Sequence, residues 1–103
     1  MLIHTDERNF DKIKNSSKLF LLDFFATWCG PCHMLGAELE KVAKDHDDFD
    51  IVKIDTDENM SLARTFGVEV LPTLFIFKDG KPVKRLEGYM PAETVVKFVE
   101  NFK

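Results

Sequence analysis

Two cysteines, Cys29 and Cys32, are the residues of this sequence with the clearest capacity for chemistry. They are its only cysteines, and they lie in the run WCGPCH at residues 28–33, between an apolar run and a segment with helical spacing. Residues at positions i and i+3 of a helix share one face, roughly 5–6 Å apart at Cβ. A disulfide needs Cα atoms about 4.4–6.8 Å apart, so a reversible bond within one helical turn is feasible. This arrangement indicates redox chemistry.

The composition narrows the class of protein. With 103 residues, 45% of them hydrophobic, the chain can bury a core without cross-links, and we expect one domain over residues 1–103. A net charge of −4 without a basic stripe argues against binding to nucleic acid. The first residues do not form a signal-peptide pattern, and no apolar run is long enough to cross a bilayer. We therefore expect a cytoplasmic protein, in which a lone cysteine pair is catalytic or metal-binding rather than a structural cross-link.

Strand and helix signals alternate on both sides of the pair. Residues 19–25 are apolar on both faces, as is typical of a central strand, and helical spacing begins at Cys29. Further strands are predicted at residues 2–4, 49–55, 73–77 and 82–86, and further helices at 6–15 (capped by Thr5), at 58–66 and from Pro91 onward. The order βαβαβαββα predicts a mixed sheet with helices on both faces, a three-layer α/β/α sandwich.

The sequence resembles the thioredoxin family. The run DFFATWCGPC at residues 23–32 is similar to the family's active-site segment, and the resemblance continues in order through KID at 53–55, GV at 67–68, LPT at 71–73, FKDG at 77–80 and Gly88. It covers essentially the whole chain and implies the thioredoxin fold, with a central five-stranded sheet flanked by four helices. It also implies a protein-disulfide reductase that works by reversible exchange through a mixed disulfide.

Each cysteine then has an expected role. Cys29, at the more exposed start of a helix where the macrodipole favours an anion, is the expected nucleophile. Cys32, one turn along and more buried, is expected to resolve the mixed disulfide. The alternative is that both are ordinary buried thiols.

Asp23 is the one charged residue in an otherwise apolar strand. Burial should raise the pKa of its carboxyl group, which suits a proton acceptor for Cys32, and the matching family residue has that role. Lys53 is its expected partner. The alternative is a purely structural ion pair between Asp23 and Lys53.

The resemblance further implies a surface that binds substrates. Pro72 is expected to be cis and to face the cysteines, and the backbone of Leu71 to pair with an extended substrate segment. Trp28 has packing as its alternative role. The expected members of this surface are Trp28, Gly30, Pro31, Val70, Leu71, Pro72, Gly88 and Tyr89.

The cofactor and partner expectations also come from the resemblance. No bound cofactor and no metal are expected, and electrons are expected from NADPH through a thioredoxin reductase, with a ferredoxin-linked reductase as the alternative. The other expected partners are proteins with disulfides. Neither nucleic acid nor a membrane is expected as a partner, and the chain is expected to be a monomer.

Three positions depart from the family pattern. His33 stands where many members have lysine, which places a residue that titrates near neutral pH beside the pair. Gly36-Ala37 stands where the helix often has a kinking proline at the second position, so a straighter helix is expected. Phe25 stands where a second tryptophan is common, which leaves Trp28 as the sole tryptophan.

Other classes of function fit parts of the pattern. Cys-x-x-Cys-His matches the attachment motif of c-type haem, for which Met60 or Met90 would be the sixth ligand, although the strand-rich pattern is unlike a small haem protein. A zinc site would use Cys29, Cys32 and His33, but His4 and His46 lie on other elements. A binding module with incidental thiols, or a disulfide oxidase or isomerase, are the remaining alternatives.

Overall fold

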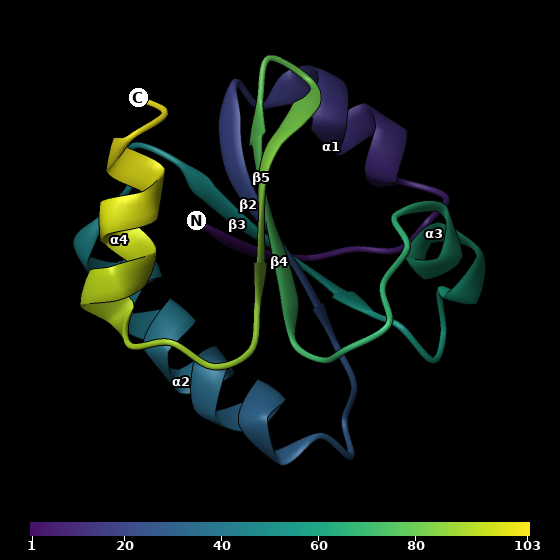
Figure 1. Ribbon diagram of the computed structural model, residues 1–103. Helices are drawn as coiled ribbons and strands as arrows, with labels where there is room; N and C mark the ends of the chain where they lie inside the picture. Colours follow the sequence, from purple (N-terminus) through teal and green to yellow (C-terminus); the bar gives the residue numbers. More distant parts are fainter.

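One mixed β-sheet runs through the centre of the molecule, with helices on both of its faces (Figure 1). A computed structural model describes all residues 1–103. The elements in chain order are β1 (Leu2–His4), α1 (Phe10–Ser16), β2 (Leu19–Phe25), α2 (Gly30–Asp45), β3 (Asp50–Asp55), α3 (Met60–Thr65), β4 (Thr73–Lys78), β5 (Lys81–Glu87) and α4 (Ala92–Glu100). The predicted element order and three-layer sandwich are confirmed.

The sheet has five strands in the order β1-β3-β2-β4-β5. β3 is parallel to both β1 and β2, whereas β4 is antiparallel to both β2 and β5. Helices connect the parallel strands, as parallel pairing requires, and a tight turn connects the last two. Asp79 (φ 52°) and Gly80 (φ 80°) both have positive φ in that turn, as the predicted hairpin requires.

β2 is the central strand because both of its faces are covered. On one face Leu21 packs with residues of α2 and α4, such as Leu39 and Val95. On the other face Phe20 packs with Phe10 of α1 in a second cluster, which also contains residues of α3. Figure 1 shows α2 and α4 on one side of the sheet and α1 and α3 on the other. The continuous apolar run therefore corresponds to a strand buried on both sides.

Two predicted helices begin later than the sequence indicates. α1 begins at Phe10 rather than at residue 6, because the Asp6 carboxylate accepts hydrogen bonds from the Asn9 backbone and side chain and closes a turn. α3 begins at Met60 rather than at residue 58, because a turn precedes it and the buried Asn59 side chain binds the Glu7 amide and the Asp55 carbonyl. The acidic residues before each helix favoured an earlier helix start, but the hydrogen bonds of Asp6 and Asn59 stabilise turns there instead.

The other element boundaries agree closely with expectation. β3 begins one residue later than predicted, β5 extends one residue further at each end, and α4 begins just after Pro91. Gly67, expected to end α3 in the left-handed region, has φ 64°. None of the four helices combines the length and apolar character needed to cross a bilayer.

Candidate active site

Cys29 and Cys32 form a disulfide at the first turn of α2. Cys29 is the N-cap residue, and its sulfur accepts a hydrogen bond from the backbone N–H of Cys32 at 3.2 Å. The two Cα atoms are 5.2 Å apart, as the spacing predicted. Pro31 lies in the first turn, where its missing N–H costs no helical hydrogen bond. The pair therefore lies where unpaired helix N–H groups stabilise negative charge on the Cys29 sulfur.

The expected difference in burial between the two cysteines is small. Cys29 is 6% exposed and Cys32 is 3% exposed, so the prediction that Cys29 lies at an exposed position is wrong for this disulfide form. The reason is local packing, since Ala26, Phe25 and Leu71 lie against the pair. The asymmetry between the cysteines comes instead from the helix terminus, because only Cys29 occupies the cap.

Asp23 is fully buried on β2, the strand that leads into the loop before the cysteine pair. It is directly opposite Lys53 in the register of β2 and β3, and Lys53 Nζ is 3.7 Å from Asp23 Oδ2. Neither carboxylate oxygen has a hydrogen-bond partner. Burial raises the pKa of Asp23 to about 6, and the positive charge of Lys53 only partly opposes that rise. The predicted pairing and the predicted direction of the pKa shift are both confirmed.

The loop before β4 contributes the opposite wall of the site. The Leu71–Pro72 peptide bond is cis, as the resemblance implied. Thr73 Oγ1 donates to the Val70 carbonyl at 2.6 Å, and the Gly88 amide donates to the Pro72 carbonyl at 2.9 Å. These two bonds hold the loop at both ends, while Leu71 packs against the cysteine cluster. Pro72 itself is buried.

Exposed apolar side chains occur in the loops at this end of the sheet. Trp28 is 71% exposed, Val70 45% and Tyr89 43%. Figure 1 shows the loops that carry them at the end of the sheet where α2 begins. The Trp28 indole N–H donates to Asp57 Oδ2 at 2.7 Å. Trp28 is therefore held by its ring nitrogen with its ring open to solvent, which argues against a packing role.

The three departures lie together on one side of the pair. His33 Nε2 donates to the Thr27 carbonyl at 2.6 Å and so connects the first turn of α2 to the preceding loop. α2 runs unbroken from Gly30 to Asp45 through Gly36. The Phe25 ring lies 4.7 Å from Lys53 Nζ, within cation–π distance.

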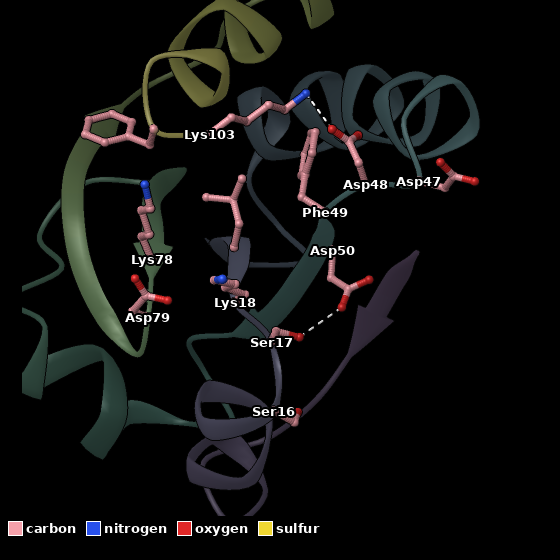
Figure 2. A pocket seen from close by; sticks show the side chains of 12 residues that line it. Ser16, Ser17, Lys18, Asp47, Asp48, Phe49, Asp50, Lys78, Asp79 and Lys103 are labelled. Atoms are coloured by element: carbon pink, nitrogen blue, oxygen red, sulfur yellow. Dashed lines mark hydrogen bonds and ion pairs between the residues drawn. The ribbon is translucent and has the colours of Figure 1, made fainter.

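A surface hollow of about 790 Å³ lies away from the cysteines and is lined in part by Phe49 (Figure 2). Two pairs of its polar side chains interact: Ser17 donates to Asp50 at 2.9 Å, and Lys103 pairs with Asp48. No cysteine lines it. No group of three or more His, Cys, Asp or Glu side chains in the molecule is placed to hold a metal ion.

Several contacts at the site were not predicted from the sequence. Asp57 is the partner of Trp28, yet it lies in the acidic run at 55–58, where no pattern distinguishes it from its neighbours. Gly36 lies close to Lys53, whereas the sequence connected Gly36-Ala37 only with a straighter helix. The Thr73 hydroxyl supports the loop; a buried threonine directly after a proline was the only available signal.

A cysteine pair that forms a disulfide at a helix start, after a strand with a buried carboxyl group in a three-layer α/β/α sandwich, defines a thiol–disulfide oxidoreductase. The thioredoxin family model matches residues 1–101. The chain is 43% identical to the thioredoxin of Staphylococcus haemolyticus over 100 residues, which cover 96% of this chain and 95% of that protein. The chain belongs to the thioredoxin family, whose members are protein-disulfide reductases that need no bound cofactor.

Solved structures agree with this assignment. A point mutant of a thioredoxin from Halobacterium salinarum superposes with a TM-score of 0.92 at 33% identity, over 98% of this chain and 89% of that one. Plasmodium falciparum thioredoxin superposes with a TM-score of 0.89 at 28% identity, over the full length of both chains. The family assignment excludes the c-type haem reading of the Cys-x-x-Cys-His motif.

Proposed function

We propose that this chain reduces disulfides of protein substrates with Cys29 as nucleophile and Cys32 as resolving cysteine. The observation that carries the proposal is the place of Cys29 at the N-cap of α2, with its sulfur accepting the Cys32 N–H. That environment stabilises a thiolate at Cys29 after the disulfide is reduced. Cys32 has no equivalent position.

The reaction has two exchange steps. The Cys29 thiolate attacks one sulfur of the substrate disulfide, the other substrate sulfur leaves as a thiolate, and a mixed disulfide forms. Cys32 then loses its proton to the Asp23 carboxylate and attacks the Cys29 sulfur, which breaks the mixed disulfide and releases the second substrate thiolate. Protons from Asp23 and water complete the two substrate thiols. The substrate gains two electrons, and the Cys29–Cys32 disulfide is the oxidised product.

In this scheme the charge of Lys53 limits how far burial raises the pKa of the proton acceptor, Asp23. Without its charge, the buried carboxyl group of Asp23 would hold a proton more tightly and accept one from Cys32 less often at neutral pH. A pKa of about 6 leaves Asp23 mostly ionised at pH 7 while keeping it a stronger base than an exposed carboxylate.

Substrates would dock on the exposed apolar surface around the pair. We assign it the residues Trp28, Gly30, Pro31, Val70, Leu71, Gly88 and Tyr89, together with Pro72, which is buried and would shape the loop. The Leu71 backbone would pair with an extended substrate segment as an added strand does. Aromatic and aliphatic exposure of this kind beside a reactive group is typical of a docking site.

The electron source, location and assembly are also proposals. NADPH would supply electrons through a thioredoxin reductase, which would reduce the Cys29–Cys32 disulfide by the reverse exchange. A cytoplasmic location suits a reductant. We propose that residues 1–103 act as one domain and as a monomer, with no nucleic acid or membrane partner.

Insulin reduction tests the proposed function. The chain should reduce insulin when NADPH and a thioredoxin reductase are supplied, and Cys29→Ser should abolish turnover because no nucleophile remains. A ferredoxin-linked reductase is tested in parallel. If only the ferredoxin-linked enzyme supports turnover, it is the electron donor in place of the NADPH-dependent reductase. Retention of a biological function by Cys29→Ser would favour a binding module instead.

A further inference from the structure

The ammonium group of Lys53 lies in an enclosure that depends on a glycine. Nζ is 3.7 Å from Asp23 Oδ2 and 4.7 Å from the centroid of the Phe25 ring. Gly36 of α2 lies on another side, where a Cβ atom would be 3.3 Å from Nζ. Such a contact is tight enough to require movement, since packed interiors yield poorly to added atoms. A side chain at position 36 would therefore press on the ammonium.

The ammonium has room to move away from Asp23. A hollow of about 310 Å³ adjoins it, lined by Phe25, Ala26, Thr27, Cys32, His33, Gly36, Ala37, Glu40 and Lys53. Glu40 lies one helical turn beyond Gly36 and is exposed. A displaced ammonium would thus move toward solvent and toward a second carboxylate.

We propose that Gly36 is a positioning residue, which leaves the space that holds the Lys53 ammonium at ion-pair distance from Asp23. The inference rests on the proposed role of Asp23 as proton acceptor and assigns to α2 the control of its counter-ion. Attraction between two charges falls with distance. A side chain at position 36 that moved Nζ outward would therefore leave Asp23 harder to ionise.

Other charged or titratable groups around this ion pair come from two elements, α2 and β1. His33 and Glu40 of α2 line the hollow with Lys53. His4 of β1 is opposite Lys53 in the register, and its ring lies edge-on to Phe25 with centroids 6.3 Å apart. Lys53 is the only one within ion-pair distance of Asp23. Substitutions at position 36 should therefore alter the pKa of Asp23 chiefly by moving Lys53.

Titration of the Asp23 carboxyl group tests the proposal directly. The oxidised protein is the right form, because the Cys29–Cys32 disulfide does not titrate. Carbon-13 NMR would follow Asp23 in the wild type and in Gly36→Ala, and again in each protein with Lys53→Met. Ala37→Gly, at the next position of the same helix and beside the same hollow, is the matched control.

The expected result is a shift that depends on Lys53. A Cβ atom 3.3 Å from Nζ requires the ammonium to move by a few tenths of an ångström. Displacing a unit charge outward from 3.7 Å by about 0.3 Å at an effective dielectric constant near 20 predicts a rise of about a quarter of a pH unit in the pKa of Asp23 for Gly36→Ala. With Lys53→Met, the same substitution should leave the titration unchanged, and Ala37→Gly should leave it unchanged in both backgrounds. A Lys53-dependent rise supports the proposal. A Lys53-dependent fall would overturn it, since it would show that a side chain at position 36 brings the ammonium closer to Asp23.

Two further outcomes would also overturn the proposal. An equal shift with and without Lys53 would show that residue 36 acts through general structure. An unchanged pKa of Asp23 in Gly36→Ala, and also in the larger Gly36→Val, would show that the position of Lys53 does not depend on the space beside Gly36. Insulin reduction by the wild type is measured separately, so a failure of the proposed function is distinguishable from a failure of this inference.

Discussion

Asp23 and Lys53 lie directly opposite each other on β2 and β3, yet their charged groups are 3.7 Å apart and no hydrogen bond joins them. The ion pair is therefore too weak to offset the burial of the carboxylate, and the pKa of Asp23 rises to about 6. An isolated structural ion pair would lower that pKa instead. The balance leaves a carboxyl group that exchanges a proton near neutral pH, on the strand that leads to the cysteine pair.

Replacing Asp23 with asparagine should slow the second exchange step and leave the first nearly intact. Loss of a general base costs about a hundredfold or more in many enzymes; we expect about tenfold here, because water can also accept a thiol proton. In the wild type the second step should speed up as pH rises through about 6, where Asp23 ionises. Stopped-flow decay of a preformed mixed disulfide between pH 5 and 9 measures this step.

The variant Asp23→Asn should lose the inflection near pH 6 and accelerate only as Cys32 itself ionises. Glu58→Gln removes an exposed carboxylate in the turn that follows β3 and is the control. An Asp23→Asn profile that matches the wild type would contradict the role of proton acceptor.

The same substitution should stabilise the oxidised protein at neutral pH. The pKa of Asp23 is about 6 in the folded protein, against an ordinary value of 3.8. Between those values the folded state binds more protons than the unfolded state, so stability falls as pH rises from about 4 to 6. The buried carboxylate thus costs about 3 kcal/mol above pH 6, at 1.36 kcal/mol for each pKa unit.

Asp23→Asn removes that cost but leaves an unpaired buried amide, so we expect a net gain of about 2 kcal/mol at pH 7.5. Below pH 4 the gain should disappear. Urea unfolding of the oxidised proteins at both pH values gives the comparison. An equal effect at both would show that the pKa shift is not its cause.

Replacing Cys32 with serine should trap substrates. Cys29 can still attack a disulfide, but no thiol remains to break the mixed disulfide that forms. Non-reducing gels and mass spectrometry should find covalent complexes through Cys29, and Cys29→Ser in the same background should form none. Normal release of product by Cys32→Ser would rule out the resolving role.

Replacing Trp28 with alanine should lower kcat/KM for protein substrates more than for small disulfides. Removal of an exposed aromatic anchor from a docking surface costs on the order of 1–2 kcal/mol, so kcat/KM for insulin should fall about tenfold. The rate with a small aromatic disulfide should change about twofold or less. Asp57→Ala, which frees the indole N–H, should give an intermediate loss for insulin. Equal losses for both substrates would indicate damage to the cysteine pair rather than to docking.

Local sequence rules predicted most elements and failed where distant partners intervene. The apolar run of β2, the cysteine spacing and the Asp79-Gly80 turn were each predictable, because burial on both faces, i to i+3 geometry and positive φ leave direct signatures in sequence. The first turns of α1 and α3 were mispredicted. Asp6 and Asn9 close the turn before α1 locally. Glu7 and Asn59, from the segments before the two helices, also hydrogen-bond across 52 positions of chain, and no local pattern reports that contact.

The sequence by itself determined the chemistry: two thiols at the start of a helix, a carboxylate within a buried strand, and a proline-containing loop to face them. The tertiary structure decided how that chemistry is tuned. It placed Lys53 near Asp23 without a hydrogen bond, gave Trp28 its partner in Asp57, and brought Gly36 against the Lys53 ammonium. The physical reason is that residue type fixes which groups can ionise or react, whereas burial and distance between elements fix the energy of their charges.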